Sequence, residues 1–269
     1  MKKGSAVTVL FGAAAFLLFA WPALYAAEKT PAAAIPTGLI QVAGYRYPVA
    51  LWVPEGYTVE QSYPLVVVIP PQGASPEQAV EYWESMGKRR NMIILAPSNL
   101  RPEDLPTQMD EWILGIKKDV LERYRIDKDR VYLFGKDDGA HYAAYLGTKY
   151  PADFSAVALV GGSWVGRFEE LIRPQARSAA QRPFIIYLKE DQKELYDKTM
   201  TKAYQFEKKG YPVQVNKVVG EDALASIEFK KQLFDLMESK SQEWQGVVSE
   251  NNKTFKERLR LAVKDFFTV

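Results

Sequence analysis

The sequence contains no cysteine. This absence excludes a disulfide framework, a thiolate nucleophile, a cysteine zinc site and a lipidated N-terminal cysteine. Histidine is almost absent too, because His141 is the only one in 269 residues. An excess of charge is also missing: the formal net charge is +2, and it falls to 0 if Lys2 and Lys3 are removed with a targeting segment. A near-neutral chain gives no electrostatic reason to bind nucleic acid or an anionic membrane surface.

The N-terminal segment has the pattern of a secretory signal. Lys2 and Lys3 are followed by an uncharged stretch that lasts until Glu28, and small residues close the apolar part. We predict that residues 1–27 are a signal peptide, that residues 28–38, rich in Ala and Pro, are a linker, and that the protein is periplasmic or secreted. An uncleaved anchor is the alternative, because the uncharged run is about long enough to span a bilayer. That anchor would be the protein's only contact with the membrane.

Residues 39–269 alternate strand-like and helix-like segments. Short runs rich in Val, Ile and Phe predict strands, and the continuous apolar ones predict strands buried on both faces. Between them, apolar residues at helical spacing predict helices, with two separate ones near the C-terminus, around 229–237 and 255–266. This alternation predicts one α/β domain with a mostly parallel, eight-stranded sheet covered by helices on both faces. The predicted strands are 39–43, 47–53, 65–69, 92–95, 131–134, 156–160, 184–188 and 213–218.

One strand leads into an unusual turn. The sequence Gly-Lys-Asp-Asp-Gly at 135–139 follows a predicted strand and precedes a helix rich in small residues. This segment resembles the nucleophile elbow of α/β hydrolases, normally Gly-x-Ser-x-Gly. The segments 47–69, 125–132 and 150–158 look like those of secreted esterases, the relatives of polyhydroxybutyrate depolymerase and feruloyl esterase. The resemblance implies an α/β-hydrolase fold.

The resemblance also locates the residues that would carry the chemistry. Asp137 stands where the family has its nucleophilic serine, and Asp191 matches the triad acid. The loop after the last strand, 220–224, holds no histidine. The first interpretation of His141, four residues after Asp137 on the same helix, is a structural residue with a satisfied hydrogen bond. The second is a rewired Asp137–His141 pair, since residues four apart on a helix are neighbours. If Asp137 and Asp191 approach each other, one pKa would rise unless Lys136, Lys189 or a cation compensates.

The region that would hold the oxyanion is altered as well. Family members usually carry His-Gly-x-Gly after the third strand, whereas this chain has Pro70-Pro71-Gln72-Gly73, and proline offers no N–H donor. We predict Gln72, Gly73, Asp138 and Trp164 as binding residues, with packing as the alternative for Trp164. Oxygen ligands for calcium could come from five acidic residues, Asp137, Asp138, Asp191, Glu221 and Asp222, but no recognised loop spacing supports a metal site. We therefore predict no metal and no cofactor.

These observations favour an exported protein that has lost its catalysis. Removal of a triad serine or histidine costs about 10⁶ in turnover in a well-studied protease. The first hypothesis is therefore a degenerate esterase-like protein that binds a small or polymeric ester-like ligand, or a partner, in the former active-site cleft. The second is an active hydrolase with Asp137 as nucleophile or base, assisted by His141 or a carboxylate. A structural role in the cell envelope without any ligand is the third.

Overall fold

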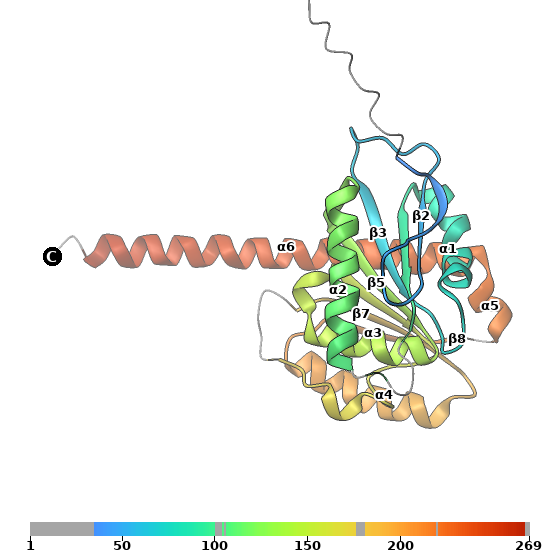
Figure 1. Ribbon diagram of the computed structural model, residues 1–269. Coiled ribbons are helices and arrows are strands. Elements are labelled where there is room, and N and C mark those ends of the chain that lie inside the picture. Colours follow the sequence, from blue (N-terminus) through green and yellow to red (C-terminus); the bar gives the residue numbers. More distant parts are fainter. Residues whose placement is uncertain (1–34, 100–103, 105, 176–180, 219, 267–269) are drawn as a thin grey trace, which may run out of the picture. The chain divides into compact units, whose positions relative to one another are not determined.

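The computed structural model describes residues 35–99, 104, 106–175, 181–218 and 220–266, without the side chains of Phe255 and residues 258–266. The predicted signal peptide and the linker up to residue 34 lie outside these ranges. Pro36–Val269 form one structural unit (Figure 1). Among the described helices, none is both long enough and apolar enough to cross a membrane.

An eight-stranded sheet forms the centre of this unit. Its order is β1-β2-β4-β3-β5-β6-β7-β8, and β2 is antiparallel to both of its neighbours while the strands from β4 to β8 run parallel. All eight predicted strands are present, and their ends differ from the predicted ones by at most two residues, except that β5 begins five residues before its predicted start. The strands are β1 (Gly38–Gln41), β2 (Val49–Val53), β3 (Tyr63–Ile69), β4 (Ile93–Pro97), β5 (Ile126–Lys136), β6 (Ala156–Val160), β7 (Phe184–Lys189) and β8 (Val213–Val218).

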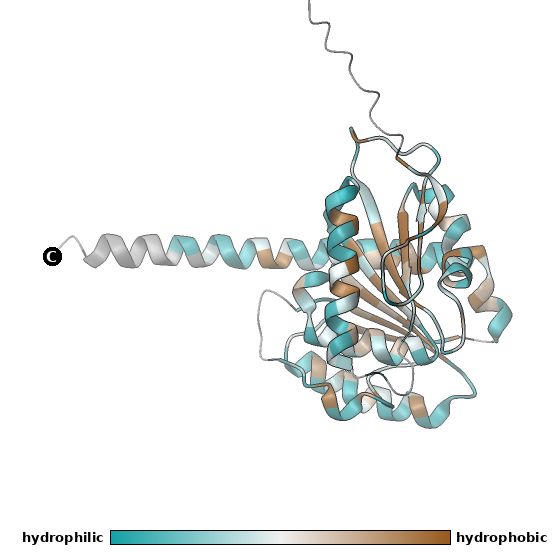
Figure 2. Cartoon of the chain, in the orientation of Figure 1, coloured by the Kyte–Doolittle hydropathy of each residue, from teal (hydrophilic) through white to brown (hydrophobic). Residues whose placement is uncertain are grey.

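Helices cover both faces of the sheet. One face packs against α2 (Pro106–Arg123), α3 (Asp138–Lys149) and α4 (Lys193–Lys208), and the other against α1 (Pro76–Arg90), α5 (Glu221–Ala225) and α6 (Ile227–Phe266). Two short 3₁₀ helices, Pro151–Asp153 and Glu169–Leu171, lie between strands. Strands β3, β4 and β6 are buried along their whole length, as expected for apolar strands covered on both faces (Figure 2).

The C-terminal part of the chain corrects the sequence prediction. Two helices were expected, but α6 is one continuous helix of 40 residues. The polar stretch between the two apolar patterns contains no proline, and the single Gly246 costs only about 1 kcal/mol in a helix. A change of polarity alone therefore does not end the helix.

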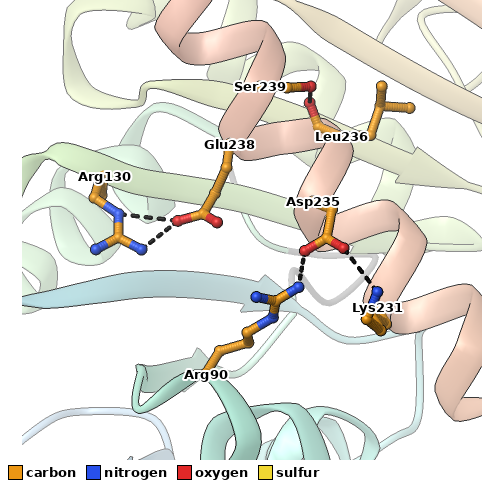
Figure 3. Close-up of polar contacts among 7 residues, drawn as sticks. All are labelled: Arg90, Arg130, Lys231, Asp235, Leu236, Glu238 and Ser239. Atoms are coloured by element: carbon orange, nitrogen blue, oxygen red, sulfur yellow. Dashed lines mark hydrogen bonds and ion pairs between the residues drawn. The ribbon is translucent and has the colours of Figure 1, made fainter.

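The first turns of α6 are fixed to the sheet and to α1. Phe229, Leu233, Phe234 and Met237 are buried against the sheet. Arg90, at the end of α1, pairs with Asp235, and Arg130 of β5 pairs with Glu238 (Figure 3). From Gln242 onward most of the described side chains of this helix are exposed.

Candidate functional site

The sharp bend between β5 and α3 has the predicted elbow geometry. Asp137 has φ 50° and ψ −120°, a conformation that a non-glycine residue adopts only under strain. Two glycines permit the bend. A Cβ atom on Gly135 would lie 2.5 Å from the carbonyl oxygen of Gly139, and one on Gly139 would lie 2.5 Å from that of Pro70. The bend therefore presents Asp137 at the carboxyl edge of the parallel strands.

The side chain of Asp137 lies between two lysines. Its Oδ2 is 3.7 Å from Nζ of Lys136, and its Oδ1 is 3.9 Å from Nζ of Lys189. Gly161, directly after β6, makes room for this carboxylate, because a Cβ atom at that position would overlap Oδ1. About a third of the Asp137 side chain, 36%, remains exposed to solvent. The acid at the elbow is therefore partly solvated and electrostatically compensated.

Glu221 enters the same site from the loop after β8. It begins α5, in the part of the chain where the family resemblance places the catalytic histidine. Its carboxylate forms a close ion pair with Lys189, and its Oε2 lies 3.6 Å from Nζ of Lys136. The hydrogen bond from Lys189 lowers the pKa of Glu221, and the same bond raises the pKa of Lys189. Lys136, Asp137, Lys189 and Glu221 are called the charge cluster below.

The sequence alone identified only part of the charge cluster. Lys136 and Lys189 were considered as compensating charges, but Glu221 was considered only as one of several calcium ligands. The position of Glu221, directly after the last strand, was the signal that could have identified it. Among the described residues, no group of three or more His, Asp or Glu side chains is placed to hold a metal ion.

His141 forms its hydrogen bond with the loop after β6. Its Nδ1 lies 2.9 Å from the carbonyl oxygen of Ser163, and the ring packs closely against Gly166. Gly162 lies beside both His141 and the backbone of Asp137, where a Cβ atom would be 3.1 Å from His141 Nε2 and 2.7 Å from the Asp137 carbonyl oxygen. Within the described part of the chain, no hydrogen bond or ion pair joins the imidazole to the Asp137 carboxylate. The ring orients a loop.

Asp191 is exposed two residues after the end of β7. Its neighbour Gln192 makes the local contacts: Lys189 N donates to Gln192 Oε1 at 3.0 Å, and Gln192 Nε2 donates to the Gly161 carbonyl oxygen at 3.3 Å. Asp191 is close enough to help raise the pKa of Lys189, which is chiefly raised by Glu221. Within the part of the chain that the structure describes, the predicted triad acid is therefore linked to Asp137 through Lys189.

The structure corrects the expectation that Trp164 lines a pocket. Its side chain has no exposed area and stacks on Phe206, with ring centroids 4.1 Å apart, while Phe184 packs against the same indole. Trp164 belongs to the core between the sheet and α4.

Gln72 and Gly73 lie at the rim of a cavity of about 860 Å³. The opposite wall is formed by the β1–β2 connection and by Ser98 after β4, and Gln41 Nε2 donates across this region to Glu77 Oε1 at 3.1 Å. Asp137 and Asp138 do not line this cavity. Asp138 is instead exposed in the first turn of α3. The four predicted binding residues therefore do not converge on one place.

A smaller cavity of about 250 Å³ lies beside the charge cluster. Its walls are mostly apolar side chains from the end of β3, the loop that follows, α1 and β5, and its polar members are Gln78, Tyr82 and Lys136. It is called the apolar cavity below. Its remaining lining residues are Val68, Ile69, Pro70, Pro71, Ala74, Ala79 and Phe134.

Comparison with known proteins points to one fold. A family model described as Esterase PHB depolymerase matches residues 110–178, which include the elbow and α3. Among curated proteins, none matches the sequence of this chain.

Solved structures extend the similarity to most of the chain. A poly(3-hydroxybutyrate) depolymerase from Bordetella parapertussis is 19% identical with a TM-score of 0.52, over 70% of this chain and 85% of that one. A CE1 ferulic acid esterase from Anaeromyces mucronatus is 14% identical with a TM-score of 0.53, over 76% and 93%. A thermostable esterase is 17% identical with a TM-score of 0.50, over 80% of this chain but only 62% of its own length. The predicted α/β-hydrolase fold is confirmed.

Proposed function

We propose that this chain, which has the α/β-hydrolase fold and is similar to esterases, is an exported protein that has lost ester hydrolysis and binds a ligand at the carboxyl edge of its sheet. The observation that carries the proposal is the charge cluster. Asp137 lies between two ammonium groups, and Glu221 occupies the loop from which an imidazole would come.

The charge cluster opposes both halves of ester hydrolysis. Two ammonium groups within 4 Å attract the negative charge of the Asp137 carboxylate, and a carboxylate that would have to give up this attraction is a weaker nucleophile. If an acyl group were nevertheless transferred, a general base would be needed to activate water. Glu221 is paired with Lys189, which lowers the pKa of Glu221 and makes its carboxylate a poor base near neutral pH.

The oxyanion region supports the same conclusion. The loop after β3 begins with Pro70 and Pro71, which have no N–H to donate. The carbonyl oxygens of Ile69 and Pro70 are packed directly against Gly139 at the start of α3. Catalysis requires hydrogen-bond donors for a developing oxyanion, and neither proline of this loop supplies one.

A hydrolysis assay tests the loss of catalysis. The purified chain and Asp137→Ala are compared on p-nitrophenyl acetate and p-nitrophenyl butyrate. The expected result is the same slow, non-saturating release of nitrophenol by both proteins. Saturable turnover that disappears in Asp137→Ala would overturn the proposal.

Because residues 1–27 are proposed to be a signal peptide, the mass of the exported protein is expected to match a start at Glu28.

Active hydrolysis is the second candidate, and the strained backbone of Asp137 favours it. The conformation with φ 50° is the one in which an elbow presents a nucleophile. This candidate predicts a covalent adduct on Asp137 with slow substrates, detectable as an added mass on the peptide that contains it. It also predicts that His141→Gln abolishes turnover.

A further inference from the structure

A largely buried lysine side chain without a carboxylate partner lies near the charge cluster. Lys230, in the first turn of α6, is only 9% exposed. Among the described residues, no Asp or Glu forms an ion pair with it. Its Nζ lies 4.2 Å from the ring centroid of Tyr82, which lines the apolar cavity.

Three features make this ammonium group costly. Burial lowers the pKa of Lys230, and the nearby positive charge of Lys136 lowers it further. The N-terminal turn of a helix also disfavours a cation, because the helix dipole is positive there. An anion beside Lys230 would offset all three effects.

The apolar cavity reaches Lys136, and Lys230 approaches it through the ring of Tyr82. Lys136 lines it directly, and its Nζ lies 5.9 Å from the same Tyr82 ring that Lys230 contacts. The ion pairs of Lys136 with Asp137 and Glu221, at 3.7 and 3.6 Å, are longer than hydrogen bonds. The donors of Lys136 therefore have room for a further acceptor.

We infer that the apolar cavity binds a small apolar monocarboxylate, whose carboxylate lies between Lys136 and Lys230 and whose hydrocarbon part lies against Pro70 and Phe134. The volume of about 250 Å³ corresponds to roughly eight water-sized groups. An aromatic or short-chain acid of that size therefore fits. This inference rests on the proposed ligand-binding function and names its ligand class.

Calorimetric titration with benzoate tests the inference, with benzamide as the uncharged probe of nearly the same shape. Saturable binding of benzoate, and binding of benzamide weaker by about tenfold or more, are expected because charge-assisted hydrogen bonds would be lost. No saturable binding of benzoate, or equal binding of both compounds, would overturn the inference. Sulfate as a third probe is expected to bind weakly, and sulfate binding as tight as that of benzoate would also contradict it.

Matched variants locate the site. Lys230→Met keeps the apolar stem against Tyr82 and is expected to weaken benzoate binding about tenfold or more. Lys231→Met is the control, because Lys231 is the next residue of the same helix and its side chain is exposed. Its Nζ lies 3.2 Å from Oδ2 of Asp235 (Figure 3). Lys231→Met is expected to leave the affinity unchanged. Equal affinities of wild type and Lys230→Met would place benzoate elsewhere.

A cavity-filling variant tests the apolar half separately. Ala79 is buried and lines the cavity, so Ala79→Leu is expected to block benzoate while the protein still unfolds cooperatively on heating. If Ala79→Leu does not fold, Gln78→Trp, on the exposed rim of the same cavity, replaces it with the same expectation. Unchanged benzoate affinity in a folded variant would contradict the inferred position. Asp137-dependent ester turnover would overturn the proposed function, whereas absent benzoate binding without turnover overturns this inference alone.

Discussion

At the scale of single residues, Asp137 combines backbone strain with favourable electrostatics. Its φ of 50° and ψ of −120° cost a side-chain-bearing residue about 1–3 kcal/mol, while Lys136 and Lys189 attract its carboxylate. Glycine adopts this conformation without that cost. The two contributions can therefore be separated by comparing two substitutions that both remove the carboxylate.

We expect Asp137→Gly to be more stable than Asp137→Ala by about 1 kcal/mol, because only glycine relieves the strained conformation. Urea denaturation of the two variants measures the difference. Equal stabilities would show that the bend relaxes around alanine, and the strain argument would then be wrong.

Glu221 predicts a defined acid dependence of stability. The hydrogen bond from Lys189 places its pKa in the folded protein below the ordinary value of 4.5. A carboxyl group with a lowered folded-state pKa contributes stability that is complete above its unfolded-state pKa. That contribution is lost as the pH falls through the lowered folded-state pKa. Because more than half of the side chain, 53%, is exposed, solvent screening keeps the effect small.

Glu221→Gln is therefore expected to lower the melting temperature slightly at neutral pH and to have no effect at a pH below the folded-state pKa of Glu221. Thermal unfolding over a pH series measures this convergence. Asp222→Asn is the control, since the Asp222 carboxylate forms no ion pair with a described residue and a flat difference is expected. A constant deficit of Glu221→Gln at every pH would contradict the assigned ion pair.

At the scale of secondary-structure elements, the contact between α3 and the end of β3 depends on a missing side chain. A Cβ atom at Gly139 would collide with backbone atoms of Ile69 and Pro70, which cannot rotate away. We expect Gly139→Ala to destabilise the fold by about 2–3 kcal/mol. Gly115→Ala, in α2 with open space around it, is expected to stabilise by about 0.5–1 kcal/mol. Chemical denaturation measures both, and the same sign for the two variants would contradict this packing.

A buried carboxylate joins α2 to α3. Asp110 has no exposed area and accepts hydrogen bonds from Tyr142 and Tyr145, both at 2.8 Å, and from Lys149 at 2.7 Å. Burial of Tyr142, together with the negative charge of Asp110, raises the pKa of this tyrosine. The network occupies the end of α2 that faces α3, so it fixes how the two helices pack.

Asp110→Asn is expected to cost about 2–3 kcal/mol, because the new amide donors would be buried without acceptors. Lys149→Met is expected to cost less than Asp110→Asn, since the Lys149 side chain is partly exposed while the tyrosine hydrogen bonds to Asp110 remain. Urea denaturation ranks the two variants. A greater loss in Lys149→Met would show that the ion pair, and not the tyrosine hydrogen bonds, dominates.

At the scale of the whole molecule, α6 has a packed first half and a largely exposed continuation. Trp244 is half-buried beside β7 and β8, and Gln245 Nε2 donates to the Asp129 carbonyl oxygen at 3.1 Å. The described side chains from Ser249 onward are exposed. Removal of residues 250–269 is therefore expected to change the melting temperature by less than about 2 °C.

Removal of residues 240–269 is expected to lower the melting temperature by about 5 °C or more, because it deletes Trp244 and the buried Ser241. Calorimetric melting of the two truncated proteins provides the comparison. If the shorter deletion were as damaging as the longer one, the exposed part of α6 would have a packing role that its accessibility does not indicate.

The sequence predicted the architecture because the signals for it are local. Eight strand-like runs, the glycines at 135 and 139 and the small residues of α3 each reflect short-range geometry, so the order of elements and the elbow were identified in advance. The prediction of two helices at the C-terminus was wrong, since polarity changes along α6 without any residue that breaks a helix. Export and the boundaries of the signal peptide stay predictions.

The composition of the site was decided by contacts across the sheet edge. The sequence showed that serine and histidine are missing from the positions where the family resemblance places the catalytic pair. It did not show that Glu221 meets Lys189, because this contact depends on β7 and β8 being adjacent strands. Trp164 was expected to line a pocket but is buried. Whether an aromatic side chain faces the core or the solvent is decided by tertiary packing. The sequence by itself determined which chemical groups the chain lacks and which elements it forms. Tertiary structure decided which charges compensate one another, because electrostatic energy depends on distance in space and not on distance along the chain.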